Sequence, residues 1–333
     1  MKAIVYRDPQ LPITDPQALY EIDTPTPTPG ERDLLVKIAA LSVNPIDTKI
    51  RRTAQTDEPR ILGWDAVGEV VAVGDKVSLF SPGDKVYYAG SLIRPGTNAE
   101  YHLVDERIVA KKPVKCSDAE AAALPLTALT AWELLFDRLD VDTQQEKTLL
   151  IIGAAGGVGS ILTQLASKLT KLRVIGTASR PETADWVRTF GADHVIDHTH
   201  PLSEELAKID IQQVDYVASL THTDSHYDEI VKILAPQGKL GLIDDPKSLD
   251  ALPLKRKAIS LHWELMFTRS LFETPDMIRQ HEILSQVATL IDEGVLTTTL
   301  AEQYGTINAA NLRKAHAMIE SNKAKGKIVL EGF

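Results

Sequence analysis

The stretch TLLIIGAAGGVG, residues 148–159, decides how the middle of this chain is expected to fold. Residues 148–153 are typical of a buried strand, and the glycines open a segment, residues 159–169, whose apolar side chains recur at helical spacing. Backbone N–H groups in such a loop can approach a pyrophosphate at the positive end of the helix. Ala154 interrupts the usual G-x-G-x-x-G pattern, yet the strand–loop–helix context is the required one. We therefore predict a dinucleotide-binding loop here.

Strands and helices alternate on both sides of this loop. A helix is expected from Ser117, with Ser117 as N-cap and Glu120 completing a capping box, and a second helix is expected over residues 128–139. After the loop, the pattern predicts a helix over 181–190 and strands over 172–177, 194–197, 214–218 and 239–243. This rhythm predicts an α/β fold, a doubly wound parallel sheet covered by helices.

The two ends of the chain have a different character. Residues 24–30, TPTPTPG, cannot be helical and lead into a strand over 33–38; the turn SPGD at 81–84 and regularly placed glycines then indicate short strands of a small β-barrel. Near the C-terminus we expect an edge strand over 258–263, a helix over 275–293 and a strand over 327–330. The α/β domain, residues 119–256, is thus expected to be inserted between 1–118 and 257–333.

Composition excludes several classes of protein. The 333 residues carry a net charge of −10, and the densest basic run is the short LKRK at 254–257, so nucleic-acid binding is not expected. Cys116 is the only cysteine, which excludes an internal disulfide and a four-cysteine zinc site. No signal peptide and no apolar run of about 18 residues is found, so we expect a cytoplasmic protein without a membrane span.

The residues about 20 positions beyond the loop indicate which dinucleotide is bound. An acidic residue there would accept hydrogen bonds from the adenosine ribose of NAD, but this strand ends with Ser179 and Arg180. Hydrogen-bond donors and a fixed positive charge suit a 2′-phosphate, so we predict NADPH as the cofactor. The alternative is that Arg180 only caps a solvent-facing turn before Pro181.

Several motifs together make the chain resemble the medium-chain dehydrogenase/reductase superfamily over essentially its full length. Within it, the chain looks like the zinc-free quinone oxidoreductase branch, close to members often named zinc-type alcohol dehydrogenase-like. The resemblance implies a GroES-like β-barrel catalytic domain, an inserted Rossmann domain, a cleft between them and a homodimer. The motifs are SVNPID at 42–47, GWDxxG at 63–68, PGDxV at 82–86, GTNAEY at 96–101 and the AAGGVG loop at 154–159.

The resemblance also shows where a metal would have been. Zinc alcohol dehydrogenases place a Cys at the position of Asn44 and His-Glu at the positions of Trp64 and Asp65, and zinc needs such thiolate and imidazole ligands. We therefore expect no metal. A rival site is a cluster of His222 and His226, four residues apart, with His194, His198 and His200 near the strand ends, but no Cys or other obvious ligand joins these histidines.

Chemistry without a metal restricts the substrate. Unactivated alcohol oxidation needs help to remove the alcohol proton, whereas a quinone or an α,β-unsaturated carbonyl spreads the developing charge onto an oxygen that one or two donors can stabilise. We predict hydride transfer from NADPH to such an acceptor. The alternatives are a metal-free alcohol or aldehyde oxidoreductase and a non-catalytic NADPH-binding sensor or partner protein.

The resemblance assigns roles to individual residues. Catalytic candidates are Asn44 and Lys49 as donors, Trp64 as the ring filling the place of a metal-bound imidazole, and Thr127, which equally well caps its helix. The alternatives to a direct role for Lys49 are that it pairs with Asp47 or that it points to solvent. Lys327 is either close to the cofactor or part of a solvated basic turn. The full set of expected cofactor-binding residues is Thr130, Ala155, Gly156, Gly157, Val158, Gly159, Ser179, Arg180, His198, Ile243 and Lys327.

Overall fold

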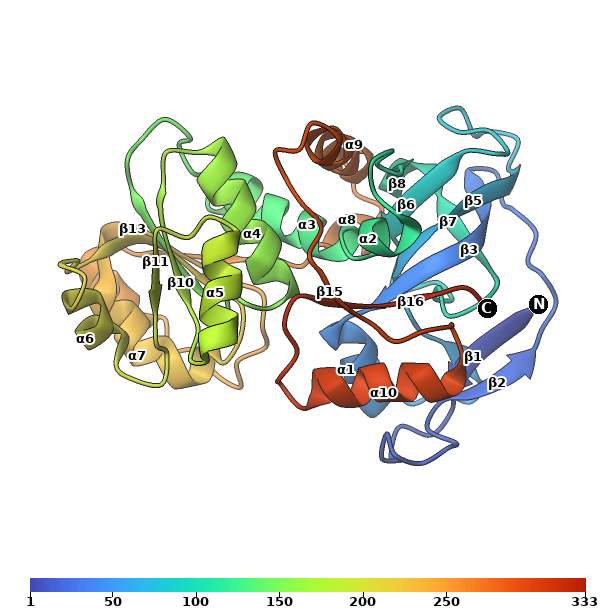
Figure 1. The fold of residues 1–333 in the computed structure, drawn as a ribbon, viewed down its shortest axis with the longest axis horizontal. Coiled ribbons are helices and arrows are strands. Elements are labelled where there is room, and N and C mark those ends of the chain that lie inside the picture. Colours follow the sequence, from blue (N-terminus) through green and yellow to red (C-terminus); the bar gives the residue numbers. More distant parts are fainter. The chain divides into compact units, whose positions relative to one another are not determined.

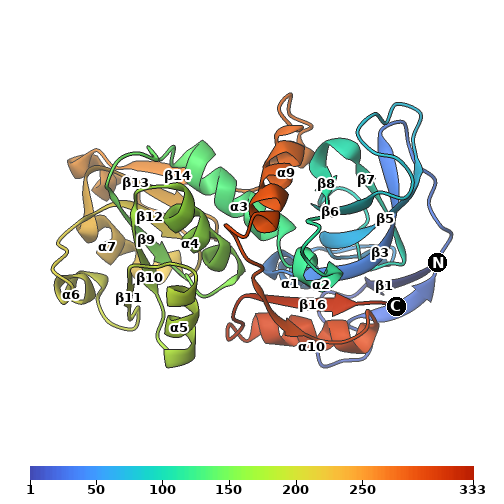
Figure 2. The same ribbon diagram turned by 45° about the horizontal axis from the view of Figure 1, so that its top comes forward.

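The computed structural model describes residues 1–333, which divide into two compact units (Figures 1 and 2). The first unit is Met1–Leu129 together with Phe267–Phe333, and the second is Thr130–Met266. Both boundaries lie later in the chain than the expected residues 118 and 256. The physical reasons are that helix α2 (Asp118–Ala122) packs on strands β3 (Asp33–Val43) and β5 (Asp65–Val73) of the first unit, and that strand β14 (Ser260–Trp263) pairs with the sheet of the second.

The second unit is built on a six-stranded sheet in which every neighbouring pair is parallel. Its order is β11-β10-β9-β12-β13-β14, with β9 as Thr148–Ile152, β10 as Arg173–Thr177, β11 as His194–Ile196, β12 as Val214–Ser219 and β13 as Leu234–Leu242. Helices α4 (Gly157–Leu169) and α5 (Pro181–Thr189) cover one face, and α6 (Leu202–Ala207) and α7 (Thr223–Ile233) cover the other (Figures 1 and 2). This is the doubly wound arrangement that the strand–helix alternation predicts.

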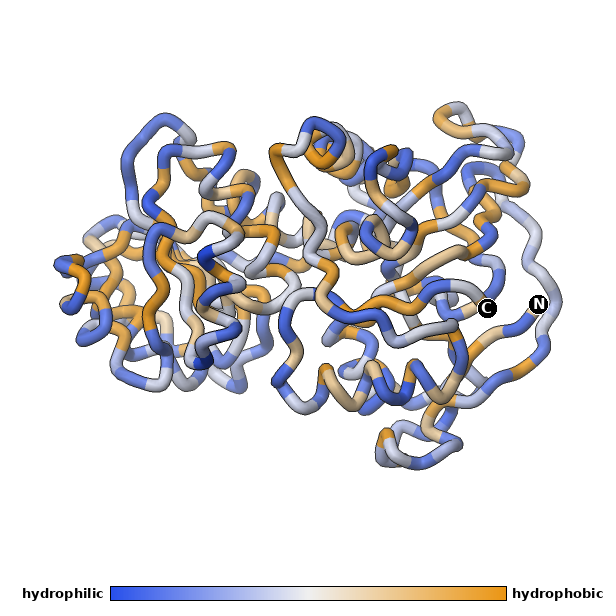
Figure 3. The backbone as a smooth tube through the Cα atoms, viewed as in Figure 1, coloured by the Kyte–Doolittle hydropathy of each residue, from blue (hydrophilic) through white to orange (hydrophobic).

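Burial of the sheet explains why its strands are so apolar. Side chains from β9, β12 and β13 meet those of α6 and α7 in one core, among them Leu150, Val217, Leu240, Leu206 and Ile233. Figure 3 shows these strands as hydrophobic and the loops around them as hydrophilic. A parallel sheet covered on both faces has no solvated side, so its strands read as continuous apolar runs instead of alternating ones.

The first unit is β-rich, as expected for a GroES-like barrel. A seven-stranded sheet runs in the order β15-β16-β3-β5-β6-β8, with β7 paired to β3, and a three-stranded sheet runs β2-β1-β4. The remaining strands are β1 (Lys2–Tyr6), β2 (Tyr20–Asp23), β4 (Arg60–Ile61), β6 (Lys85–Ala89), β7 (Tyr101–Asp105), β8 (Val109–Lys111), β15 (Leu300–Gln303) and β16 (Lys327–Glu331). The remaining helices of this unit are α1 (Pro45–Thr53), α8 (Thr268–Leu271), α9 (Arg279–Asp292) and α10 (Ala309–Glu320).

Local signals and tertiary packing contributed differently to these elements. The capping box of Ser117 and Glu120 is confirmed. The helix expected over 128–139 is instead α3 (Pro125–Trp132) followed by a π-helical segment, Glu133–Arg138. The polar helix α1 packs against α10, where buried Arg51 forms a 2.8 Å ion pair with Glu320.

No helix of the chain has both the length and the apolar character needed to cross a membrane.

Candidate active site

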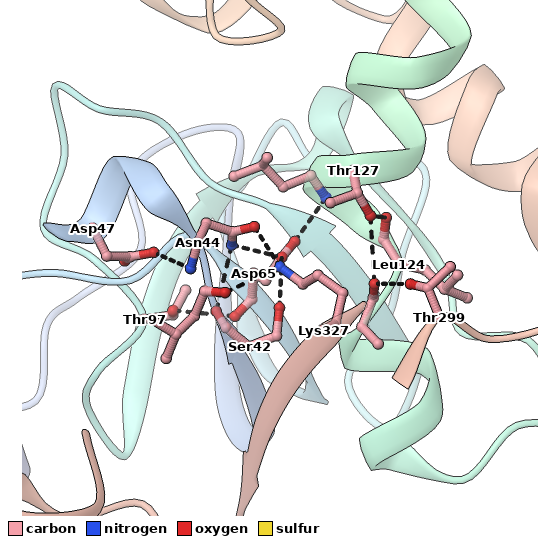
Figure 4. A network of polar contacts seen from close by, with 12 residues as sticks. Ser42, Asn44, Asp47, Asp65, Thr97, Leu124, Thr127, Thr299 and Lys327 are labelled. Atoms are coloured by element: carbon pink, nitrogen blue, oxygen red, sulfur yellow. Dashed lines mark hydrogen bonds and ion pairs between the residues drawn. The ribbon is translucent and has the colours of Figure 1, made fainter. Parts of the chain in front are cut away.

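A buried polar cluster of the first unit is organised around Asp65, the first residue of β5 (Figure 4). The Asp65 side chain is fully buried. Its Oδ2 atom accepts hydrogen bonds from Ser42 Oγ at 2.7 Å, Asn44 Nδ2 at 2.8 Å and Lys327 Nζ at 3.0 Å, and its Oδ1 atom accepts one from the backbone N–H of Leu126 at 2.7 Å. Burying a carboxylate without such partners would be strongly unfavourable, so these contacts satisfy both oxygens of the buried Asp65 side chain.

Strand register brings these side chains together from distant parts of the sequence. Strand β3 lies between β5 and β16 and is antiparallel to both, with Ser42 opposite Asp65 on one side and Val43 opposite Ile328 on the other. Lys327 opens β16, so its side chain starts beside the end of β3. Asn44 follows directly and is the N-cap residue of α1. The cluster therefore forms where three strands and a helix start or end.

The amide of Asn44 has only one orientation that its neighbours allow. The Lys327 ammonium can only donate, so it faces Asn44 Oδ1, while the carboxylate of Asp65 can only accept, so it faces Nδ2. The second N–H of that amide has only the Ser42 carbonyl at 3.5 Å, which is long for a hydrogen bond. One N–H is thus left to donate to another oxygen.

Lys327 is one of the buried charges of this unit, with 3% of its surface exposed. Its ammonium donates to Asp65 and Asn44 and also approaches the carbonyl of Val43 at 3.3 Å. The expectation of a solvated basic turn is therefore wrong for this residue, because β16 carries its side chain into the interior. Contact between Lys327 and the cofactor stays a prediction.

The helix that starts at Asn44 carries two further titratable candidates. The Asp47 carboxylate accepts the backbone N–H of Asn44 at 2.7 Å. Burial of this carboxyl, opposed by that hydrogen bond and by the Lys327 charge, raises the pKa of Asp47 to about 7. Lys49 is exposed on the same helix, and its role as a donor to substrate stays a prediction.

Trp64 belongs to the core of the first unit. Its indole is fully buried, its N–H donates to the Ser91 carbonyl at 3.0 Å, and its ring meets Phe267 edge-on with centroids 6.2 Å apart. All of its hydrogen-bonding capacity is used inside the unit. Trp64 therefore packs in this core, and its catalytic role stays a prediction.

Tyr88 and His102 form a second buried pair in the same unit. His102 Nε2 faces the Pro95 carbonyl at 3.0 Å and must donate to it, so Nδ1 accepts from the Tyr88 hydroxyl at 2.9 Å. Burial lowers the pKa of His102 to about 4. Both side chains are core residues, and the pair fixes one neutral tautomer of the histidine.

Thr127 and Thr130 lie on α3, on opposite sides of the boundary between the units. The Thr127 hydroxyl donates to the carbonyls of Leu124 at 3.1 Å and Ala123 at 3.4 Å. It does not accept a backbone N–H, so the N-cap interpretation is wrong. Thr130 is likewise buried. Their contact with a nicotinamide stays a prediction.

The residues at the position of a catalytic zinc do not fit that metal. Asn44 and Trp64 provide no thiolate or imidazole, and the Asp65 carboxylate already accepts hydrogen bonds from its neighbours. No group of three or more His, Cys, Asp or Glu side chains in the chain is arranged so that it could hold a metal ion. His198 and His226 lie with ring centroids 6.2 Å apart, and burial lowers the pKa of both.

The glycine loop of the second unit fits a dinucleotide. Gly156 is the N-cap of α4 and has no side chain to satisfy the first N–H groups of the helix, which leaves them for an anion. Gly153 has a φ of +83°. A Cβ atom on Gly159 would lie 2.4 Å from the Gly153 carbonyl oxygen and 2.5 Å from Ala154 Cα, so only glycine permits this close packing of helix and strand. The intervening Ala155, Gly157 and Val158 are half-buried.

The residues expected to select the cofactor lie at or just beyond strand ends of the same sheet. Ser179 and Arg180 follow β10 and are exposed, and Arg180 Nε lies 3.2 Å from Glu182 Oε1, also exposed. Ile243 follows β13, with its N–H directed at the Ser219 carbonyl at 3.4 Å. The carboxyl ends of parallel strands are where such sheets bind ligands. A 2′-phosphate contact of Arg180 stays a prediction, as does the alternative that it caps the turn.

Comparison with known families agrees with this geometry. A family model described as an alcohol dehydrogenase GroES-like domain matches residues 30–114, and one described as a zinc-binding dehydrogenase matches residues 190–330. A zinc-type alcohol dehydrogenase-like protein of Staphylococcus aureus (strain MSSA476) is 43% identical over 91% of this chain and 92% of its own length. A chloroplastic quinone-oxidoreductase homolog of Spinacia oleracea is 31% identical over 94% of each chain.

Solved structures show the same fold over the whole chain. A proposed zinc-dependent alcohol dehydrogenase of Rhizobium etli CFN 42 has a TM-score of 0.97 at 55% identity, covering 100% of this chain and 98% of its own. The quinone oxidoreductase of Coxiella burnetii has a TM-score of 0.82 at 27% identity, covering 100% and 99%. Mycobacterial Rv1454c, solved with NADPH, has a TM-score of 0.84 at 28% identity, covering 99% and 100%.

Proposed function

Because this chain belongs to the medium-chain dehydrogenase/reductase superfamily, in its quinone oxidoreductase-like branch, we propose that it is an NADPH-dependent reductase of quinones or α,β-unsaturated carbonyls. The observation that carries this proposal is the Asn44–Asp65–Lys327 cluster. It offers a fixed amide donor where zinc-dependent relatives need metal ligands, and its only carboxylate is already paired with an ammonium.

The donor set favours an acceptor that is already activated. Reduction of a quinone or an enone places negative charge on a carbonyl oxygen, and an N–H positioned in advance stabilises that charge. The second N–H of Asn44, whose contact with the Ser42 carbonyl is long at 3.5 Å, is suited to this task. Removing a proton from an unactivated alcohol would need a metal or a strong base, and the cluster offers neither, because the Asp65 carboxylate accepts four hydrogen bonds.

The second unit would hold the nucleotide. NADPH supplies the hydride when it is bound. The N–H groups at the start of α4 would hold its pyrophosphate, with Gly159 allowing the approach of helix and strand, and Ser179 and Arg180 would meet the 2′-phosphate. Relatives described as quinone oxidoreductases, and one solved with NADPH, support this assignment.

Steady-state oxidation of NADPH with a panel of quinones and enones tests the proposal. We expect turnover that is unchanged by a metal chelator and at least about 10-fold more efficient with NADPH than with NADH, the ratio expected for one charge-assisted contact. Turnover of simple alcohols with NADP⁺ in place of the panel would overturn the substrate class. Tight NADPH binding without any turnover would favour a sensor instead.

A homodimer is part of the same proposal. Strand β14 is the outer strand of the six-stranded sheet, so its outer edge presents N–H and C=O groups, and Trp263 at its end is 51% exposed. An edge of this kind is a surface on which a second copy can continue a sheet. Light scattering should give the mass of two chains, and a monomeric mass at micromolar concentration would refute it.

A further inference from the structure

We propose that Lys327 and Asp65 are positioning residues for hydride transfer, because together they hold the Asn44 amide in a single orientation, with Oδ1 facing the ammonium and Nδ2 facing the carboxylate. The inference rests on the proposed reductase function. Neither residue needs to touch the substrate. Each acts through Asn44, one on its oxygen and the other on its nitrogen.

Rotation of the Asn44 amide would reverse both of its contacts. The oxygen and nitrogen of an asparagine side chain exchange places by a half-turn about the last side-chain bond. In the reversed orientation the amide N–H groups would face the Lys327 ammonium, and the amide oxygen would face the Asp65 carboxylate. Both contacts would then be repulsive, in a region where Asn44 is only 1% exposed and water cannot compensate. The ion pair therefore selects the orientation that donates.

The Lys327–Asp65 ion pair acts on the orientation of Asn44 and not through a net charge. A lone buried ammonium would attract a developing oxyanion through its charge. Here Lys327 Nζ lies 3.0 Å from Asp65 Oδ2, so the pair is neutral overall and its field falls off rapidly with distance. The backbone N–H of Leu126 donates to the other oxygen of Asp65, so the carboxylate keeps a fixed partner even when the Ser42 hydroxyl is absent. The pair consequently contributes geometry rather than net charge.

The buried ammonium comes from β16 and reaches residues that are distant in sequence. Lys327 Nζ contacts the Val43 carbonyl of β3, the Asn44 amide and the Asp65 carboxylate of β5, all more than 260 positions away. Its position is set by the register of three antiparallel strands, which is more rigid than a loop.

The test is a neutral pair, Asp65→Asn/Lys327→Met. Removing one charge alone would leave the other buried and unpaired, but removing both at once is often neutral for stability. We expect this double variant to fold and to keep binding NADPH, because the glycine loop lies in the other unit, and its Kd is measured beside kcat so that a direct cofactor contact of Lys327 is distinguished from positioning. Its kcat with a quinone acceptor should fall by about 10-fold to 100-fold, as expected for a donor that is present but misplaced.

Ser42→Ala is the matched control. It removes a hydrogen bond to the same Asp65 oxygen and leaves both contacts of the Asn44 amide in place. We expect its kcat to stay within about 2-fold of the unmodified chain even if its thermal midpoint falls, since a lost buried hydrogen bond acts on stability. If the double variant does not fold, the amide pair Asp65→Asn/Lys327→Gln gives the same comparison with a polar replacement.

The outcomes separate this inference from the function on which it rests. A folded double variant with full kcat overturns the inference and leaves the reductase function standing. A kcat loss of equal size in Ser42→Ala, or a parallel loss of NADPH binding, also overturns it, because the effect would then be a general disturbance of the fold. Inactivity of the unmodified chain with every acceptor overturns the proposed function and the inference with it.

Discussion

Glu264→Gln should remove most of the decline in stability that this protein shows between pH 7 and pH 9. Glu264 and Glu133 are both buried in the second unit, and a single cation serves them: Arg138 Nε lies 2.8 Å from Glu264 Oε2, and its NH2 group lies 4.0 Å from Glu133 Oε2. Two carboxylates sharing one guanidinium cannot both ionise easily. Burial, and then the charge of Glu133, raise the pKa of Glu264 to about 9.

The sign and size of the effect follow from proton binding. An unfolded glutamate loses its proton near its ordinary pKa of 4.5, so between that pH and about 9 the folded chain holds one proton more than the unfolded chain. The free energy of unfolding therefore falls as pH rises, by about 1.4 kcal/mol per pH unit. From pH 7 towards pH 9 this amounts to roughly 2 kcal/mol. A glutamine keeps the neutral hydrogen-bonding shape and does not titrate.

The range from pH 7 to pH 9 separates the titration of Glu264 from that of the other buried groups. The raised pKa of Asp47, about 7, acts mainly below the window. Burial lowers the pKa of His102 to about 4 and that of His316 to about 3, so both destabilise the fold only as pH falls below about 6.5. Urea unfolding followed by circular dichroism at pH 7, 8 and 9 measures the slope.

Glu282→Gln on α9 is the matched control, because its side chain is 53% exposed. We expect it to keep the pH slope of the unmodified chain, while Glu264→Gln flattens that slope. If the free energy of unfolding of Glu264→Gln fell with pH as steeply as that of the unmodified chain, Glu264 would not be the group that loses the proton. The reasoning would then be refuted.

Three further perturbations address the cofactor site and the core. Gly159→Ala should weaken NADPH binding about 10-fold or more in a fluorescence titration, because its Cβ collides with loop backbone, and an unchanged Kd would contradict the close approach of helix and strand. Arg180→Ala should raise the Kd for NADPH by about 10-fold to 100-fold and leave that for NADH unchanged; equal changes for both would show that Arg180 does not meet the 2′-phosphate. Tyr88→Phe should lower the free energy of unfolding by about 1–3 kcal/mol, since His102 then lacks its buried donor, and an unchanged urea midpoint would contradict that role.

Much of the fold was predictable because its signals are local. The glycine loop, the Ser117 capping box and the apolar strand at residues 148–152 each depend on neighbours within a few positions, and all are found in the structure. The helix after Pro125 was predicted less well. It changes into a π-helical segment at Glu133, a rare conformation that the spacing of apolar residues does not signal.

The candidate site divides in the same way. The sequence by itself suggested Asn44 as a candidate donor and predicted that zinc is not held there, because the identities of a few side chains decide whether thiolate and imidazole are present. It could not show that Asp65 meets Lys327, since strand register alone brings these two residues to 3.0 Å. Nor could it show that the Trp64 side chain is fully buried in the core. Burial and pairing are properties of the packed chain, so tertiary structure decided which polar residues of the site act together.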